Sequence, residues 1–336
     1  MKRILYVGIY SDGTTSKMRA DILRSILTGW EFQVIDTDIP KRSMPHLWQS
    51  VGFRYKIGPL INKVNQYVLI NIGNKHYDLI WVDKAIYLTK ATTQLLRSFA
   101  GKLVHYTPDP AFTFHKSHLF YKSLPLYDFA VTTKLFELQH YISFLEENQV
   151  LYVTQGFDRN VHHPVSRFEN KKGVCFLGHY EEERGKTLQM LLDNGIDVTL
   201  AGINWEKFVA RNNSNLKLQY LGIGVYGEAY VRTLSSACIS WGSLSKWIPE
   251  LHTTRTFEIP ACGTALLTER NKETKSFFND DEAIFYSSKE ELLDKVKFYL
   301  THKDALKEIT ENGYNRVLSD GRDYESIMRK ILQQIL

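Results

Sequence analysis

The sequence predicts an α/β protein with two domains, each built around a parallel β-sheet. Short apolar segments bounded by turn residues, which are typical of buried strands, recur along the chain and alternate with longer segments of helical periodicity. This alternation favours parallel sheets, because parallel strands need a crossover connection that is usually a helix. A chain of 336 residues is long for a single core, so two domains of roughly 150 residues each are expected.

The first domain is expected to open with a strand, a helix and a second strand. Residues 3–10 are apolar, residues 17–29 carry apolar side chains at helical spacing, and residues 32–36 are again apolar. Gly8 and Gly13 do not form the G-x-G-x-x-G sequence that binds NAD or FAD, so neither cofactor is supported. The other elements expected in this half are strands at 77–83, 102–106, 129–133 and 150–153 and helices at 89–100 and 134–147.

The second domain is expected to follow a polar, turn-rich linker at residues 155–164. Its expected strands are 173–178, 197–202, 218–222, 237–242 and 264–269, and its expected helices are 186–194, 228–235, 290–300 and 305–318. One more helix is expected at 324–336. These elements divide the chain into an amino-terminal domain at 1–160, a carboxyl-terminal domain at 161–320 and a final segment at 321–336.

Residues 41–75 differ from the rest of the first half, because basic residues are interleaved with aromatic and aliphatic ones. One interpretation is a helix whose apolar face packs on the sheet, which is the common arrangement in globular proteins. The second interpretation is a peripheral contact with an anionic membrane surface. The sequence alone leaves both open.

Composition narrows the class of protein. A hydrophobic content of 43% is ordinary for a globular protein, no apolar stretch reaches the length of a membrane span, and Met1-Lys2-Arg3 leads into a strand without a signal sequence. The three cysteines, Cys175, Cys238 and Cys262, have no metal-like spacing, so we expect buried free thiols and a cytoplasmic location. The net charge of +5 fits an anionic ligand or membrane surface and is too small to indicate nucleic acid.

The most informative stretch is residues 237–269. Its two ends are predicted strands, and a loop and a short helix lie between them. Thr253 or Thr254 can cap the helix, and Gly263 can end it because glycine tolerates positive φ. The start of a helix presents unpaired N–H groups and roughly half a positive charge, which suits a phosphate, and Arg255 lies in that first turn.

Two glutamates accompany this predicted phosphate site. Glu250 and Glu258 are separated by seven residues, and Ala261-Cys262-Gly263 follows. This pattern resembles the donor-site signature of the large glycosyltransferase family 4 group. A longer run is still more similar to the spore maturation CgeB-like glycosyltransferases, and the specific part of the resemblance covers about residues 173–318. That run is Arg255-Thr256-Phe257-Glu258-Ile259-Pro260-Ala261-Cys262-Gly263 with Leu266-Leu267-Thr268-Glu269.

The resemblance implies the GT-B fold, in which two Rossmann-like βαβ domains face a central cleft and the last helix crosses back onto the first domain. It also implies that Glu258 accepts hydrogen bonds from the ribose of a nucleotide-sugar donor and that Glu250 lies near the donor sugar. Residues 178–186 resemble the loop whose two cations grip the donor diphosphate. Arg184 and Lys186 supply positive charge there, while His179 stands where family 4 usually has arginine. The remaining donor-binding candidates are Arg255, Thr256, Thr254 and Tyr226.

The first domain is then expected to hold the acceptor. Asp83, His105 and Asp109 are the polar residues at predicted strand ends, where ligands bind in open α/β sheets. An inverting transferase needs a base at the acceptor hydroxyl, for which Asp109 is the first candidate and His105 the second. A retaining transferase needs its leaving diphosphate stabilised, which cations and a helix start provide without metal. We favour the retaining, metal-independent reaction.

The predicted function is glycosyl transfer from a nucleotide-diphosphate sugar, of UDP or GDP type, to a hydroxyl of a glycan or lipid-linked acceptor. The expected pathway is synthesis of a cell-surface polysaccharide or glycoconjugate, with no further cofactor. One alternative is a nucleotide-sugar epimerase of the same fold, which should show more catalytic carboxylates around the donor. The other is a non-catalytic nucleotide- or glycan-binding partner subunit, which the replacement at His179 favours.

Overall fold

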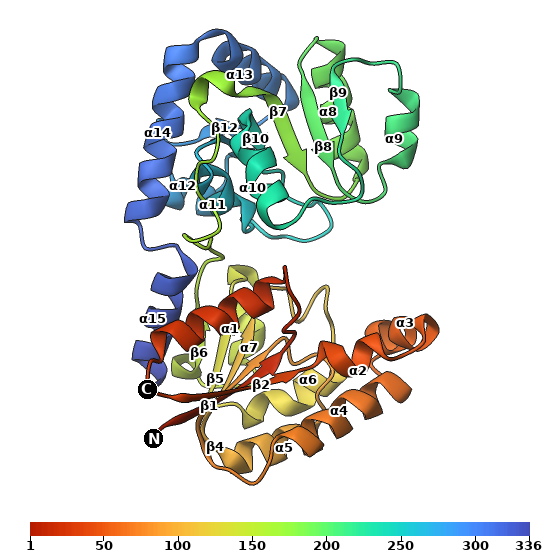
Figure 1. The fold of residues 1–336 in the computed structure, drawn as a ribbon, viewed down its shortest axis with the longest axis vertical. Coiled ribbons are helices and arrows are strands. Elements are labelled where there is room, and N and C mark those ends of the chain that lie inside the picture. The colour runs from red at the N-terminus through yellow and green to blue at the C-terminus, as the bar shows by residue number, and fades with distance from the viewer. The chain divides into compact units, whose positions relative to one another are not determined.

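The computed structural model describes residues 1–336 and divides the chain into two compact units (Figure 1). Unit 1 comprises Met1–Thr154 together with Tyr324–Leu336, and unit 2 comprises Gln155–Asp323. Each unit contains one six-stranded sheet in which every paired strand is parallel. The predicted architecture of two parallel α/β domains is therefore confirmed.

Unit 1 has the strand order β2-β1-β3-β4-β5-β6. Its strands are β1 (Arg3–Gly8), β2 (Glu31–Asp36), β3 (Tyr77–Asp83), β4 (Ala100–Thr107), β5 (Phe129–Thr132) and β6 (Val150–Tyr152). Its α-helices are α1 (Thr15–Ile26), α2 (Asp38–Arg42), α3 (His46–Tyr55), α4 (Pro59–Asn71), α5 (Lys90–Phe99), α6 (His118–Ser123), α7 (Leu138–Ile142) and α15 (Tyr324–Ile335).

Helices bury both faces of the unit 1 sheet, as a parallel sheet requires. Alternate residues of β1 point to opposite faces, so Leu5 and Val7 join one hydrophobic cluster while Ile4 and Tyr6 join another. The first cluster includes Leu60 and Val64 of α4 and Leu96 of α5. The second is covered by α1 and α15, which pack side by side although the chain separates them by nearly 300 residues (Figure 1). The carboxyl-terminal helix is thus part of unit 1.

Unit 2 has the strand order β12-β11-β10-β7-β8-β9. Its strands are β7 (Lys172–Leu177), β8 (Val198–Ala201), β9 (Leu218–Tyr220), β10 (Ala237–Trp241), β11 (Ala265–Glu269) and β12 (Ile284–Tyr286). Its α-helices are α8 (Glu182–Asp193), α9 (Glu206–Arg211), α10 (Gly227–Ser235), α11 (Arg255–Ala261), α12 (Lys272–Phe277), α13 (Lys289–Thr301) and α14 (Lys303–Ser319). Cys175, Cys238 and Cys262 are buried and unpaired.

Two local predictions differ from the structure, and some short elements had not been predicted. The helix expected at 134–147 is broken into a 3₁₀ turn at Leu135–Glu137, the short α7 and a second 3₁₀ turn at Glu147–Gln149. Glu146 forms a capping box at the start of this second turn. Helix α8 starts at Glu182, four residues earlier than expected, and its acidic first turn suits the positive end of the helix dipole. The short elements α12 and β12 were not anticipated.

Residues 41–75 contain the end of α2, all of α3 and all of α4. Helix α4 packs against the sheet through Leu60, Val64 and Val68, as the first interpretation of this stretch expects. Helix α3 does not pack in this way, because only Gly52 of its residues is buried. No helix of the structure combines the length and the apolar character that crossing a membrane requires.

A buried ion pair joins α1 to the end of β3. The Arg19 guanidinium donates from Nε to Asp83 Oδ2 (2.8 Å) and from Nη2 to Oδ1 (3.0 Å), and both side chains are almost fully buried. The Tyr6 hydroxyl also donates to Asp83 Oδ2, at 2.9 Å. Asp83 is therefore a structural residue of unit 1, although sequence reasoning placed it among the polar residues at the predicted cleft.

The buried His105 predicts a pH dependence of stability. Burial lowers its pKa to about 3 from an ordinary value of 6.5. Between these values the unfolded chain takes up a proton at His105 and the folded protein does not, so the free energy of unfolding falls as pH falls, by up to about 1.4 kcal/mol per pH unit. Urea unfolding at a series of pH values measures this slope.

The controls for this test are two substitutions. His105→Phe should remove this component of the slope, whereas His46→Gln, at an exposed position on α3, should keep it. The same pH dependence in His105→Phe and wild type would contradict the assignment.

Candidate functional site

The topology of unit 2 locates the candidate site. From β7 the chain proceeds through β8 to β9 on one side of the sheet, and then returns to β10, which pairs with β7 on its other side. The loops that follow β7 and β10 therefore leave the sheet in opposite directions. Open α/β sheets bind ligands in the crevice at the carboxyl ends of two such strands.

The loop after β7 is held tightly against the loop after β8. The Gly178 amide donates to the Ala201 carbonyl (2.9 Å), and the Trp205 indole donates to the Gly178 carbonyl (2.8 Å). Gly202 has φ +149°, and a Cβ atom there would lie 1.9 Å from the Gly178 oxygen. Only glycine fits at 202, and the contact fixes the direction in which the β7 loop continues.

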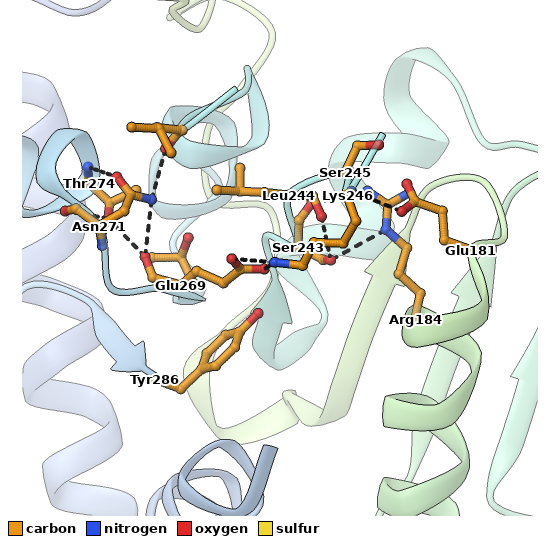
Figure 2. A network of polar contacts seen from close by, with 12 residues as sticks. Glu181, Arg184, Ser243, Leu244, Ser245, Lys246, Glu269, Asn271, Thr274 and Tyr286 are labelled. Carbon is orange, nitrogen blue, oxygen red and sulfur yellow. Dashed lines mark hydrogen bonds and ion pairs between the residues drawn. The ribbon is translucent and has the colours of Figure 1, made fainter. Parts of the chain in front are cut away.

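Arg184 connects the two loops. It lies on α8 and is 2% exposed, and its Nε donates to Ser243 Oγ (3.3 Å) just after β10. Its Nη1 is 2.9 Å from Glu181 Oε1 and also donates to the His179 carbonyl at 3.2 Å. Figure 2 shows Arg184 among Glu181 and the residues that follow β10. Burial lowers the pKa of Arg184 to about 10, so the guanidinium stays charged at neutral pH.

His179 lies beside Arg184 in the loop after β7. Its Nε2 is 2.9 Å from Glu181 Oε1 and 3.1 Å from Arg184 Nη1, and its ring stacks on Trp247 with centroids 5.2 Å apart. Burial and the nearby Arg184 lower the pKa of His179, although Glu181 opposes them. The imidazole is therefore neutral at physiological pH, so it does not replace the full charge of the arginine that family 4 usually has there.

Arg255 brings a second guanidinium to the end of β7. Its Nη1 donates to the carbonyl of Leu177, the last residue of that strand, and its Nε is buried without a hydrogen-bond partner. A Cβ atom on Gly178 would lie 3.2 Å from Arg255 Nη1, so the loop passes directly beside the guanidinium. Arg184 and Arg255 thus supply two positive charges at one strand end.

Glu258 lies on α11, and its carboxylate is held by two neighbours. The Tyr230 hydroxyl donates to Oε2 at 2.6 Å, and His162 Nε2 lies 3.7 Å from Oε1. His162 Nδ1 accepts from the Asp158 amide (3.0 Å), so in the neutral ring Nε2 carries the proton and faces Glu258. Burial and the carboxylate of Glu258 raise the pKa of Tyr230 well above its ordinary value, which keeps Tyr230 a donor.

The start of α11 differs from the sequence prediction. Thr254 is the N-cap residue but has helical dihedrals and makes no capping hydrogen bond, and the Thr256 hydroxyl instead accepts from the Thr253 amide at 3.1 Å. The prediction that a threonine side chain caps this helix is therefore wrong. Gly263 has φ +67° directly after the helix, and this end of the helix is confirmed.

The other predicted donor residues are spread over unit 2. Lys186 points outward on α8 and pairs with Glu182 (2.8 Å) and Glu183 (3.0 Å), while Tyr226 is 74% exposed before α10. Glu250 is half-buried in the loop between β10 and α11. The structure therefore gathers Arg184, His179 and Arg255 at one strand end, and it does not place Lys186 or Tyr226 with them.

Sequence reasoning missed several residues of the site. Glu181 and Ser243 contact Arg184, Trp247 stacks on His179, and His162 and Tyr230 hold Glu258. Ser243 directly follows a predicted strand, so the strand-end rule could have found it. Arg184 also lines a cavity of about 320 Å³ whose polar lining includes the Lys246–Glu269 ion pair, at 2.8 and 2.7 Å (Figure 2).

Unit 1 has its own cavity at the carboxyl ends of its strands, with a volume of about 150 Å³. Asp109 lines it, 2.7 Å from Lys84 Nζ and 3.8 Å from His115 Nε2. Burial acts to raise the pKa of Asp109, but Lys84 and His115 outweigh it and hold that pKa below its ordinary value. His105 also borders the cavity, yet it is 2% exposed and packs against the Phe120 ring at 4.4 Å. With its low pKa, His105 is a poor proton acceptor.

The chain contains one Asp-x-Asp sequence, Asp36-Thr37-Asp38, whose carboxylates could in principle hold a metal ion. These carboxylates are engaged within unit 1. Asp36 Oδ1 accepts from the amides of Tyr10 (3.0 Å) and Asp38 (2.9 Å), and Asp38 Oδ2 lies 3.1 Å from Arg42 Nε. No group of three or more His, Cys, Asp or Glu side chains is arranged to hold a metal ion.

Comparisons with known proteins identify the fold. Residues 184–333 match the family model described as glycosyl transferase-like. Sucrose-phosphate synthase from Thermosynechococcus elongatus has a TM-score of 0.71 at 13% identity, over 99% of this chain and 98% of that one. A glycosyltransferase from Rickettsia africae has a TM-score of 0.69 at 14% identity, over 99% and 97%. Anabaena Alr3699/HepE, in complex with UDP and glucose, has a TM-score of 0.64 at 14% identity, over 99% of both chains.

The fold is therefore GT-B, two Rossmann-like α/β domains in one chain, as the resemblance in the sequence implied. At these identities the likeness shows the fold and not the activity. The matched family model covers less than half of the chain, and it contains Arg184, Arg255 and Glu258. A comparison with curated protein sequences gave no match.

The geometry around His179 predicts how its pKa responds to its two charged neighbours. Arg184→Met should raise the pKa of His179, because it removes a positive charge 3.1 Å from Nε2. Glu181→Gln should lower that pKa, because it removes a negative charge at 2.9 Å. Imidazole chemical shifts measured by NMR against pH give both values, with the other histidines as internal references. Shifts of the same sign in both variants would contradict the arrangement.

Proposed function

We propose that this protein is a glycosyltransferase that moves a sugar from a nucleotide-diphosphate donor to a hydroxyl of a glycan or lipid-linked acceptor. We further propose, from the sequence resemblance alone, that its donor side is of the type found in family 4 and the spore maturation CgeB-like enzymes. Two findings support the proposal: the glycosyl transferase-like family model matches residues 184–333, most of which belong to unit 2, and glycosyltransferase structures share the whole fold.

The observation that carries the proposal is the group of Arg184, Arg255 and Glu258 in unit 2. Arg184 and Arg255 meet at the end of β7, where the strand order reverses. A diphosphate is a strong anion, and planar guanidinium groups bind its oxygens in pairs. Glu258 lies on the same helix as Arg255, and its carboxylate still has acceptor capacity for ribose hydroxyls beside Tyr230.

UDP is the first nucleotide to test. The structure of Anabaena Alr3699/HepE is in complex with UDP and glucose in one case and with UDP-glucose in another. We therefore propose a donor of UDP type, with GDP type second.

The proposed location is the cytoplasm, which fits three buried, unpaired cysteines because free thiols persist in reducing compartments. The proposed product is a surface polysaccharide or glycoconjugate.

The proposed reaction exchanges one bond at the anomeric carbon. The bond to the diphosphate oxygen breaks, the bond to the acceptor oxygen forms, and the acceptor proton passes to the departing diphosphate or to Asp109. Arg184 and Arg255 stabilise the negative charge that develops on the leaving group, with no metal required. We favour retention of configuration on this basis. Glu250 is proposed to lie near the donor sugar, and His105 takes no part because its pKa is about 3.

A second candidate function is a non-catalytic nucleotide-binding partner subunit. The lowered pKa of His179 favours it, because the site then has one cation fewer than a family 4 donor site. Nucleotide binding without any release of UDP from UDP-glucose would support this candidate over a transferase. The epimerase alternative has no such observation in its favour.

The role proposed for Glu258 can be tested by its effect on UDP affinity. Glu258→Gln should weaken UDP binding by about 1.5–3 kcal/mol, or roughly 10- to 150-fold in Kd, because the hydrogen bonds to the ribose lose a charged acceptor. Isothermal titration calorimetry measures the affinity directly. Wild type should prefer UDP to 2′-deoxy-UDP, and the variant should lose that preference, which a purely structural effect would not produce.

The matched control for Glu258 is Glu308→Gln, at an exposed position on α14, which should bind UDP like wild type. Glutamine is used because it keeps the size of the buried side chain and can accept from Tyr230. Unchanged UDP affinity in a folded Glu258→Gln variant would remove Glu258 from the donor site. If no nucleotide stabilises the wild-type protein against heat, the donor site itself is refuted.

Asp109→Asn distinguishes a retaining from an inverting reaction. A retaining reaction, which we favour, should release UDP from UDP-glucose in this variant at nearly the wild-type rate, because the departing diphosphate takes the acceptor proton, whereas an inverting reaction should slow by about 100-fold or more without its base. UDP affinity should not change, because Asp109 belongs to unit 1 and the donor residues belong to unit 2. Initial rates with water as acceptor give the first value, and calorimetry gives the second. Asp12→Asn, at an aspartate that is 99% exposed, is the control. A wild-type rate in Asp109→Asn would show that the reaction needs no base there.

A further inference from the structure

A long stretch of unit 1 carries no negative side chain. Residues 39–76 contain no Asp or Glu, although the chain has 37 acidic residues, and they contain six basic residues. The six are Lys41, Arg42, Arg54, Lys56, Lys63 and Lys75. Arg54 on α3 and Lys63 on α4 are exposed and form no ion pair in the structure. Lys41, Arg42 and Lys75 pair with acidic residues outside this stretch and Lys56 is buried, so the uncompensated positive charge here is that of Arg54 and Lys63.

Helix α3, within this stretch, exposes large apolar side chains. Helix α3 contacts the rest of unit 1 where Gly52 meets Leu60 of α4 and where the Phe53 ring lies beside His115. We call the exposed apolar residues of this helix and the turn after it, together with Arg54, the α3 patch. The apolar members are Leu47 (68% exposed), Trp48 (40%), Phe53 (47%), Tyr55 (57%) and Ile57 (55%).

The combination of exposed aromatic and aliphatic side chains with unpaired cations is typical of helices that lie in the interface of an anionic bilayer. The apolar groups enter the boundary between headgroups and acyl chains, and the cations are attracted to the negative surface. Helix α3 also lies at the periphery of unit 1, beyond α2 and α4 (Figure 1). Helix α4, which covers the sheet, buries Leu60, Val64 and Val68 and exposes Leu69 and Ile70 at its end, whereas α3 buries none of its large apolar side chains.

We propose that the α3 patch binds the surface of an anionic lipid bilayer. This inference rests on the proposed function in one respect, the acceptor class. Phe53 lines the cavity of Asp109, and its ring lies 5.8 Å from that of His115 in the same cavity. Docking through α3 therefore brings the acceptor side of unit 1 to the bilayer surface, so the acceptor is a hydroxyl carried on a lipid.

The test is sedimentation of the full-length protein with lipid vesicles. Wild type should bind vesicles of phosphatidylcholine mixed with phosphatidylglycerol, should not bind phosphatidylcholine alone, and should be released by high salt. Arg54→Gln should weaken binding about fivefold, the effect of one cation near the surface. Leu47→Gln with Tyr55→Gln should weaken it about tenfold or more by removing apolar contact. Circular dichroism checks that each variant is folded.

The matched controls lie in unit 2. Leu216→Gln replaces a fully exposed leucine, and Lys207→Gln replaces an exposed lysine of α9, and both should bind vesicles like wild type. Equal losses in the controls, or no binding to anionic vesicles, would overturn the proposal. A change of oligomeric state in the α3 variants with vesicle binding intact would make the patch a contact between copies, which also overturns it.

The outcome is separable from that of the proposed function, because vesicle binding needs no donor. A protein that binds vesicles but no nucleotide refutes the donor site alone. A protein that binds UDP but no vesicles refutes the α3 proposal alone.

Discussion

The donor side of unit 2 depends on one buried cation, Arg184. A guanidinium that is 2% exposed is costly unless its donors are satisfied, so the surrounding chain is arranged to satisfy it. Glu181 supplies the charge partner, and His179 and Ser243 supply further acceptors from the loops after β7 and β10. Because those loops diverge from adjacent strands, the contacts of Arg184 hold them at a fixed separation. The position of the candidate phosphate site follows from this separation.

Much of the fold could be predicted from local sequence. The strands are short apolar runs, and β3 was bounded correctly because its apolar residues 79–82 lie between Asp78 and Asp83. Local sequence could not show that Tyr230 and His162 hold Glu258, because those contacts join residues far apart in the chain. The start of α8 at Glu182 did have a local signal, the acidic first turn, which the helical periodicity alone does not include. The paired glutamates and Arg255 had a local pattern, so sequence reasoning could find them.

The two polar residues proposed for the acceptor side show why residue type at a strand end is insufficient. His105 lies within β4, two residues before its end, and is surrounded by aromatic rings without a partner for either ring nitrogen. Asp109 lies just beyond the same strand, where Lys84 and His115 approach it. His105 and Asp109 are only four residues apart, yet His105 is buried and neutral whereas Asp109 is charged and accessible. That difference comes from the packing of neighbouring segments, which periodicity does not report.

The membership of α15 in unit 1 has a consequence for biosynthesis. The face of the unit 1 sheet that carries Tyr6 and Trp81 is completed by Ile327, Met328 and Ile331, which the ribosome adds after all of unit 2. Unit 2 is continuous in sequence, so its core needs no segment that is made after Asp323. Unit 1 is made first, but part of its core stays open until α15 has been added. The fold of the earlier half of the chain therefore depends on the last segment to be made, whereas the fold of the later half does not.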